Sequence, residues 1–178
     1  MRAASLLDLS LGAPELRLCL RMNQLGTRPR LRRLLVVVSR LGDGVAWYAL
    51  MLALALFGGR AGAQACLHLA ALGLVALGLY HGLKRCTRRP RPFVRHGSIT
   101  AHLAPLDEFS FPSGHTLHAA SFTLVAVHYF PALGLLLWPF AILVGLSRVA
   151  LGLHYPSDVL AASVIAVTLA RASFALVG

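Results

Sequence analysis

The stretch Ala61–Leu83, AGAQACLHLAALGLVALGLYHGL, contains no aspartate, glutamate, lysine or arginine. About 20 apolar residues cross the roughly 30 Å hydrocarbon core of a bilayer as an α-helix. A helix also satisfies its own backbone hydrogen bonds, which a spanning segment must do where no water is present. The stretch therefore predicts a membrane-spanning helix.

Four further apolar stretches accompany it: Leu34–Phe57, Gly114–Phe130, the shorter Ala132–Leu146, and Ser157–Val177. Hydrophobic residues make up 57% of the 178-residue chain, and its mean hydropathy is +0.71. A soluble domain of this length cannot bury so much apolar surface. We therefore predict an all-α integral membrane helical bundle with about five transmembrane helices, which forms one embedded domain over residues 34–178.

Residues 1–33 contain no stretch long enough to span a membrane. Within Pro14–Gly26, leucine and methionine are interspersed with Glu15, Arg17 and Arg21. This pattern predicts an amphipathic helix at the lipid headgroups, and a partly ordered tail is the alternative. The net charge is +11, and the basic residues that give it flank the predicted spans. This placement favours anionic lipids over nucleic acid as the partner.

Because consecutive spans alternate in direction, the segments Lys84–Pro112 and Ser147–Pro156 meet at one membrane face. They hold most of the polar residues, whereas glycine and proline turns close the opposite face. Ionisable residues gathered at helix ends are costly in a membrane protein and indicate function. Within the first span, Arg40 and Asp43 are spaced to form a structural ion pair.

Two clusters of chemically useful residues lie in or beside the longer segment. In the first, Lys84 and Arg91 belong to a basic run at the end of a span, although such runs also serve only to bind headgroups. In the second, Pro112 precedes Ser113, Gly114 and His115 at a predicted helix start. The positive end of a helix and a glycine that admits close approach together predict an anion site.

The third cluster joins the last two spans. Arg148 offers a planar guanidinium that matches phosphate oxygens. His154 lies just before the last helix, and Asp158 lies in its first turn, where a carboxylate can orient one imidazole nitrogen. Together the three clusters supply the cations, nucleophile and acid that phosphoryl transfer requires.

In order and at full spacing, these clusters resemble the signature of the type-2 phosphatidic acid phosphatase superfamily, which also includes the vanadium-dependent haloperoxidases. The motifs read Lys84-x6-Arg91-Pro92, Pro112-Ser113-Gly114-His115 and Ser147-Arg148-x5-His154-x3-Asp158. The resemblance covers Leu34 to the C-terminus and points to the bacterial membrane lipid phosphatases.

The resemblance implies that His154 forms a phosphohistidine, that Asp158 raises its nucleophilicity, and that His115 protonates the leaving group. It implies that phosphate is bound by Lys84, Arg91, Ser113, Gly114 and Arg148. No metal or other cofactor is expected, and vanadate, a mimic of five-coordinate phosphorus, is expected to inhibit. The three cysteines lack metal-ligand spacing.

Membrane members of this family usually have six spans, and this chain offers five. Without the first span, the N-terminus and the site lie on the same side. After the three predicted phosphate-binding cations are left out, eleven lysines and arginines flank that side, against Arg60 and Arg171 on the other. By the positive-inside rule, we predict a multi-pass protein of the cell (inner) membrane with a cytoplasmic active site.

We therefore expect a metal-independent phosphatase that acts on a lipid phosphomonoester or diphosphate, such as phosphatidylglycerol phosphate, phosphatidic acid or a polyprenyl (di)phosphate. Two alternatives stay open: a lipid phosphotransferase, and a non-catalytic lipid-binding or transport membrane protein. We expect Asp107 and Glu108 to be solvated loop carboxylates, unless they orient a headgroup. The sequence does not predict the oligomeric state.

Overall fold

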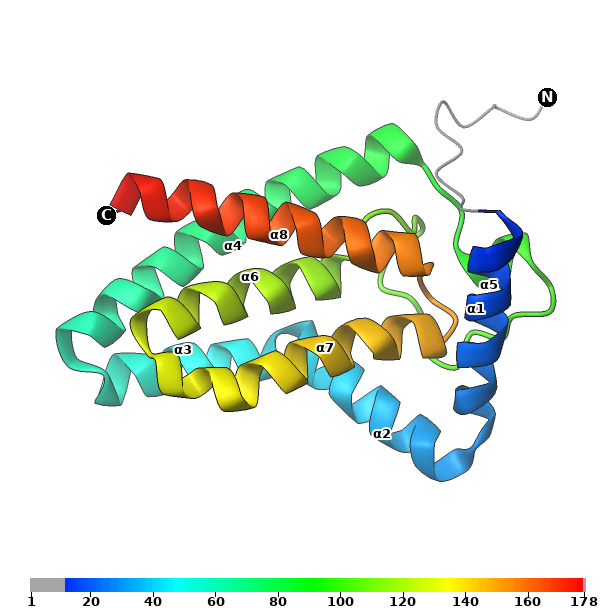
Figure 1. Cartoon of the computed structure of the whole chain (residues 1–178), viewed down its shortest axis with the longest axis horizontal. Coiled ribbons are helices and arrows are strands. Elements are labelled where there is room, and N and C mark those ends of the chain that lie inside the picture. The colour runs from blue at the N-terminus through cyan, green and yellow to red at the C-terminus, as the bar shows by residue number, and fades with distance from the viewer. Residues whose placement is uncertain (1–11, 178) are drawn as a thin grey trace.

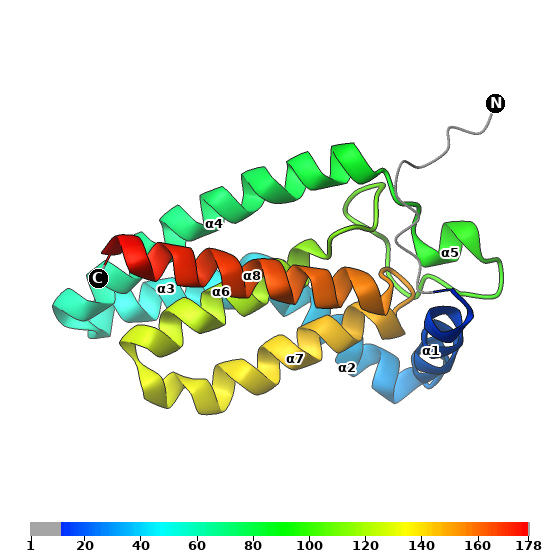
Figure 2. The ribbon, with the colours of Figure 1, turned by 45° about the horizontal axis from the view of Figure 1, so that its top comes forward.

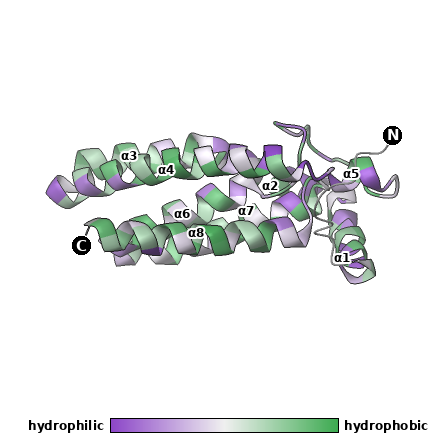
Figure 3. Cartoon of the chain, turned by 90° about the horizontal axis from the view of Figure 1, so that it is seen from above, coloured by the Kyte–Doolittle hydropathy of each residue, from purple (hydrophilic) through white to green (hydrophobic). Residues whose placement is uncertain are grey.

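The computed structural model describes residues 12–177, and the regular elements in that range are helices. In chain order they are α1 (Ala13–Asn23), η1 (Gln24–Thr27), α2 (Pro29–Arg40), η2 (Leu41–Val45), α3 (Ala46–Phe57), α4 (Gly59–Thr87), α5 (Pro92–Arg95), α6 (Gly114–Tyr129), η3 (Pro131–Leu133), α7 (Gly134–Ala150) and α8 (Pro156–Val177). Figure 3 shows α3 and α4 in one layer and α6, α7 and α8 in the other. Figures 1 and 2 place α1 and α5 together at one end of this bundle.

Four helical segments in the described range are long and apolar enough to cross a membrane: Pro29–Phe57, Gly59–Thr87, Pro131–Ala150 and Pro156–Leu176. The fifth predicted span is α6, which has only 16 residues. It packs against α4, α7 and α8, and it buries Thr116, Ser121 and Thr123. A helix enclosed by other helices meets little lipid, so it tolerates these hydroxyls. The predicted all-helical membrane fold is confirmed.

The outer surface of the bundle is apolar. Leu135 is 89% exposed and Phe57 is 86% exposed, and Figure 3 shows hydrophobic colouring along the helices with hydrophilic residues concentrated near α5. Large apolar side chains that face outward over several helices are stable when the surrounding solvent is lipid. The polar end therefore marks the membrane face where the site lies.

The first candidate span, Pro29–Phe57, is interrupted by η2, which separates α2 from α3. Gly44 has a φ of 135° there, a conformation that glycine adopts at little cost because it has no Cβ. The break is a π-helical turn, and such turns occur often at functional sites. It sets Asp43 on the inner side of the first span, among the residues that line a cavity.

Helix α1 closes the polar end of the bundle by packing against α7 and α8. Cys19 is buried there with Ile99 and Val149, and the Asn23 amide donates hydrogen bonds of 2.9 and 3.2 Å to the carbonyls of Thr100 and Ala150. The amphipathic helix that the sequence predicts is thus present as α1. Residues 1–11 of the predicted N-terminal segment lie outside the described residues, and the contact of α1 with headgroups stays a prediction.

Candidate active site

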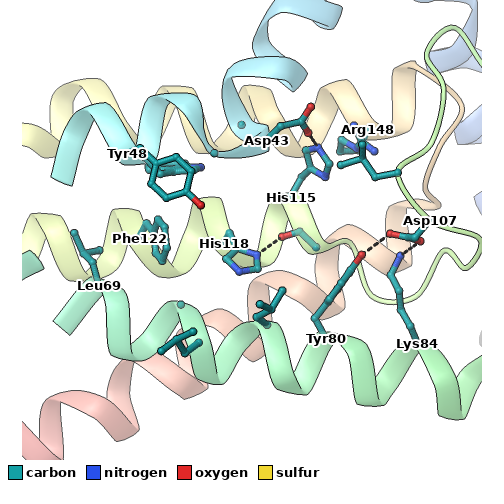
Figure 4. Close-up of a pocket in the computed structure, with 18 of the residues that line it drawn as sticks. Asp43, Tyr48, Leu69, Tyr80, Lys84, Asp107, His115, His118, Phe122 and Arg148 are labelled. Atoms are coloured by element: carbon teal, nitrogen blue, oxygen red, sulfur yellow. Dashed lines mark hydrogen bonds and ion pairs between the residues drawn. The ribbon is translucent and has the colours of Figure 1, made fainter. Parts of the chain in front are cut away.

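The three sequence clusters converge at the polar end, where they line a cavity of about 510 Å³ (Figure 4). Six of the eight predicted site residues line it: Lys84, Arg91, Gly114, His115, Arg148 and His154. The other two, Ser113 and Asp158, are fully buried. Residues that are up to 74 positions apart in the sequence are therefore brought together by the ends of α4, α6, α7 and α8.

The end of α4 holds the first two cations in place. Arg88 adopts a left-handed conformation with a φ of 45°, which ends the helix and turns the chain. Arg91 then precedes α5 and lies beside Lys84 of the last turn of α4. The side chains of Lys84 and Arg91 are only 6% and 2% exposed. Two cations so far from solvent require an anion between them.

Asp107 supplies that anion, contrary to the expectation of a solvated loop carboxylate. Its Oδ1 accepts a hydrogen bond from Lys84 Nζ and one of 2.9 Å from Arg91 Nη2, and its Oδ2 accepts one from the Tyr80 hydroxyl (Figure 4). Burial acts to raise the pKa of this carboxyl, but the hydrogen bonds from Lys84 and Tyr80 and the charges of Lys84 and Arg91 lower it to about 2. The neighbouring Glu108 is exposed, as expected.

The start of α6 is built by Ser113 and Gly114. The Ser113 hydroxyl accepts a hydrogen bond of 3.4 Å from the Thr116 amide and lies 2.9 Å from Thr116 Oγ1, so it caps the helix. A Cβ at Gly114 would lie 2.6 Å from Cε2 of Tyr80, so only glycine fits beneath that ring. Gly114 therefore lines the cavity as predicted, while a contact between the Ser113 hydroxyl and phosphate stays a prediction.

His115 is paired with a residue whose role the motifs do not indicate. Its Nε2 contacts Oδ1 of Asp43, which comes from η2 of the first span (Figure 4). Asp43 also forms the expected pair with Arg40, at 3.8 Å. The available signal was the Gly-Asp-Gly break in an apolar stretch, because an ionisable residue within a span indicates function.

Arg148, in the last turn of α7, is 2% exposed. Its Nη1 donates a hydrogen bond of 2.5 Å to Ser39 Oγ. Among the residues that the structure describes, its Nε has no acceptor. A buried N–H without an acceptor is costly, so this donor beside the cavity is suited to an oxygen of a bound anion.

The His154 imidazole lies between Arg91 and its predicted partner Asp158. Its Nε2 is 3.2 Å from Arg91 Nη1, and a guanidinium can only donate. We therefore assign the lone pair to Nε2 and the proton to Nδ1, which lies 3.5 Å from Asp158 Oδ2. Burial, followed by the positive charges of Arg91 and Arg148, lowers the pKa of His154 well below its ordinary value. The imidazole is thus neutral, as a nucleophile must be.

A buried network behind Asp158 fixes its carboxylate. Arg89 donates hydrogen bonds of 2.6 Å to Asp158 Oδ1 and 3.0 Å to Glu15 Oε2, and its guanidinium lies 4.0 Å from the centre of the Tyr155 ring. Glu15 also accepts a hydrogen bond of 3.0 Å from the Ser157 amide. Since Glu15 belongs to α1, the N-terminal segment takes part in holding the site. The sequence offered no signal that would separate Arg89 from the rest of its basic run.

The remainder of the cavity extends between the spans. Its lining there consists of apolar and aromatic side chains from α3, α4 and α6, which include Trp47, Tyr48, Leu69, Leu74 and Phe122. Cations and histidines occupy one end of the cavity, and apolar surface occupies the other. The shape is therefore suited to a molecule with an anionic head and an apolar tail.

Within residues 12–177, no three histidine, cysteine, aspartate or glutamate side chains are grouped so that they could hold a metal ion. The cationic groups at the cavity are lysine and arginine side chains. Metal-independent catalysis stays a prediction from the motifs.

Known proteins resemble this chain in sequence and in structure. Undecaprenyl-diphosphatase BcrC of Bacillus subtilis is 33% identical over 128 residues, which cover 69% of this chain and 63% of that protein. The crystal structure of Aquifex aeolicus LpxE superposes with a TM-score of 0.82 at 25% identity, covering 94% of this chain and 99% of the other. A transmembrane PAP2-type phosphatidylglycerolphosphate phosphatase from Bacillus subtilis superposes with a TM-score of 0.67 at 24% identity, covering 90% and 84%.

The matched part of the chain thus spans less than two thirds of the length of BcrC. The family model of the PAP2 superfamily matches residues 44–178. That range contains the three motifs and the six predicted site residues that line the cavity. The resemblance that the motifs carry is therefore confirmed, and the chain belongs to the PAP2 superfamily.

Proposed function

We propose that this chain is a membrane lipid phosphatase that hydrolyses a phosphomonoester or diphosphate headgroup through a phosphohistidine at His154. One observation carries the proposal: a single cavity has apolar walls between the spans and Lys84, Arg91 and Arg148 at its polar end. A lipid that ends in a phosphate has the same division between tail and head. A small soluble phosphate ester would leave the apolar walls unfilled.

The three cations bind and neutralise the phosphate oxygens, and the amide at Gly114 adds the positive end of α6. Lys84 and Arg91 lie on one side of the cavity, with the free Nε donor of Arg148 as a further contact. Ser113 contributes by capping α6, and its hydroxyl is also the predicted phosphate ligand. This arrangement spreads positive charge over the oxygens that carry the charge of the transition state.

The reaction proceeds in two displacements. His154 Nε2 attacks phosphorus, while Asp158 stabilises the proton on Nδ1 of the same ring. His115 gives a proton to the leaving oxygen, so the lipid departs as a neutral alcohol or, from a diphosphate, as a monophosphate. His115 then takes a proton from water, which attacks the phosphohistidine and frees both His154 and inorganic phosphate.

Candidate substrates are phosphatidylglycerol phosphate, phosphatidic acid and polyprenyl (di)phosphates. The resemblance to an undecaprenyl-diphosphatase supports the polyprenyl class. Transfer of the phosphate to a lipid alcohol is the second candidate reaction, because a cavity open to apolar walls admits a lipid acceptor as well as water. The chain contains every residue that the proposed mechanism needs, which argues against a non-catalytic lipid-binding protein.

We place the protein in the cell (inner) membrane, with its site facing the cytoplasm and anionic lipids around it. Helices α1 and α2 carry Arg17, Arg21, Arg30, Arg32 and Arg33, and Figures 1 and 2 show α1 at the same end of the bundle as α5 and the site. Basic residues beside spans favour the cytoplasmic face and the anionic headgroups there. A cytoplasmic site favours lipids that are phosphorylated in the inner leaflet.

The test uses purified full-length protein in detergent with a panel of lipid phosphates and a metal chelator. The wild type should release phosphate and form an acid-labile phosphoprotein, whereas His154→Ala should do neither. His81→Ala is the matched control, because His81 is an exposed histidine of α4 and its loss should leave both signals intact. Equal release by wild type and His154→Ala, or release that requires a divalent metal, would contradict the mechanism.

A further inference from the structure

The first span brings a carboxylate to the polar end of the cavity, where it meets the histidine assigned as the proton donor. Asp43 Oδ1 contacts His115 Nε2, although the two residues belong to different helical segments, η2 and α6. Both side chains are largely withdrawn from solvent, being 19% and 10% exposed. An ionisable side chain within a predicted membrane span is costly and indicates a function.

The backbone around Asp43 is irregular at the point where this residue contacts His115. The π-helical turn Leu41–Val45 and the positive φ of Gly44 interrupt the span at this point, and the interruption costs regular helical hydrogen bonding. Arg40, the other partner of Asp43, is 57% exposed and lies 3.8 Å away. It is therefore a weak competitor for the carboxylate. The interruption of the span therefore places the Asp43 carboxylate in contact with His115.

The charges around His115 explain why it needs a carboxylate. The cations of Arg148 on α7 and Arg91 before α5 act on it, and Lys84 lies across the same cavity. An imidazolium beside two guanidinium groups is unfavourable unless an anion is adjacent. Among the described residues, Asp43 is the carboxylate in contact with this ring. His154, which lines the same cavity, is neutral and offers no compensating negative charge.

The contact with Asp43 also determines which ring nitrogen of His115 is left for proton transfer to the substrate. With Nε2–H directed at Asp43, Nδ1 is the ring nitrogen left to face a ligand. The pair resembles that of Asp158 and His154, in which a carboxylate oxygen lies 3.5 Å from one imidazole nitrogen and the other nitrogen is left for chemistry. One dyad carries the nucleophile and the other carries the acid.

We propose that Asp43 is a positioning residue that fixes the orientation of His115 and favours the protonated form of its ring, which gives a proton to the leaving oxygen. The inference rests on the proposed phosphatase function and deepens it. As the P–O bond to the lipid breaks, its electron pair goes to the leaving oxygen, which takes the Nδ1 proton of His115. In the second displacement Nδ1 recovers a proton from the attacking water, while Asp43 remains ionised throughout.

Asp43 lies immediately before the part of the chain that the family model matches, which begins at residue 44. The three motifs therefore do not contain it. The first span consequently contributes to the chemistry as well as to the apolar wall of the cavity.

The test separates acid catalysis from structural support by varying the leaving group. A decyl phosphate releases a strongly basic alkoxide and needs a proton, whereas 4-nitrophenyl phosphate releases a stable anion and does not. We expect Asp43→Asn to lower kcat/KM for decyl phosphate about 100-fold, and for 4-nitrophenyl phosphate by less than about fivefold. Glu108→Gln removes a carboxylate from the exposed loop and serves as the control. It should change neither value.

His115→Asn should show the same dependence on the leaving group, and the double variant should lose little more than either single variant, because the two residues act as one unit. Asp43→Glu keeps the carboxylate and provides a second variant if Asp43→Asn folds poorly, which its unfolding temperature in detergent reports. Glutamate should retain most of the decyl phosphate activity. Equal losses for both substrates, or additive losses in the double variant, would overturn the role of Asp43. Absence of His154-dependent turnover in the wild type would instead overturn the proposed function.

Discussion

Replacing Asp107 with asparagine is expected to strengthen inhibition by inorganic phosphate and by vanadate. The Asp107 carboxylate accepts hydrogen bonds from Lys84 and Arg91, two of the cations predicted to bind phosphate. An incoming phosphate must compete with this carboxylate for the same donors. Asparagine keeps the size of the side chain but removes its charge, so it competes less well.

The expected size of the change in the inhibition constants follows from the pKa of Asp107, which is lowered from 3.8 to about 2. The surroundings therefore favour the ionised carboxylate by about 2.5 kcal/mol. Because the side chain is 31% exposed, solvent screening reduces this to about 1–1.5 kcal/mol, which is about tenfold in the inhibition constant. A lowered carboxyl pKa means that the charge is present above about pH 4 and is lost only as the pH falls toward 2. The effect should therefore be constant across the neutral range.

The assay measures the inhibition constants of phosphate and vanadate against turnover of a lipid phosphate, for wild type, Asp107→Asn and Glu108→Gln. Glu108 is exposed on the same loop, so its variant controls for a general change in charge. If Asp107 instead only aligned Lys84 and Arg91, its loss would weaken phosphate binding. Unchanged or higher inhibition constants for Asp107→Asn would refute the reasoning.

Three further predictions concern other parts of the site. Arg89→Met should lower kcat by about tenfold or more, because it leaves the buried Asp158 carboxylate without its 2.6 Å partner, and methylguanidinium should restore part of the loss in a rescue assay. The pKa of His154 lies well below 6.5, so the nucleophile stays unprotonated as the pH falls, and kcat/KM should show no decrease near pH 6.5 once substrate ionisation is allowed for. Cys86 is exposed in the basic segment, so an impermeant thiol reagent should fail to label it in intact cells and label it after permeabilisation. Rapid labelling from outside would place the site on the opposite face.

The fold followed from hydropathy because a bilayer imposes a simple rule on segment length. The boundaries were less accurate. The predicted span Ala61–Leu83 became α4, Gly59–Thr87, because helical hydrogen bonding continues past the apolar residues until Arg88 turns the chain. For α6, a hydropathy pattern could not distinguish a lipid-facing helix from one enclosed by other helices.

The site residues could be predicted because each belongs to one of three sequence motifs. Within each motif the spacing between residues is fixed, so the motif can be recognised without knowing the fold. Asp43, Asp107 and Arg89 escaped prediction because their roles depend on contacts across the fold. Nothing in the sequence distinguishes Asp107, which turns toward Lys84, from Glu108, which faces solvent. Such a difference is decided by loop geometry, and loop geometry depends on contacts such as the bridge between Pro90 and Phe109.

The polar end of this bundle brings several cations close together and must balance their charges. Lys84, Arg91 and Arg148, the cations predicted to bind phosphate, are all buried, so solvent does little to relieve their mutual repulsion. Three carboxylates supply negative charge near these cations. Asp107 contacts the cations directly, Asp43 contacts His115, and Asp158 is itself paired with Arg89. Of the three, Asp107 alone belongs to a loop, and its side chain is the most exposed, at 31%. We therefore expect substrate to displace Asp107, while Asp43 and Asp158 remain beside the predicted acid and nucleophile.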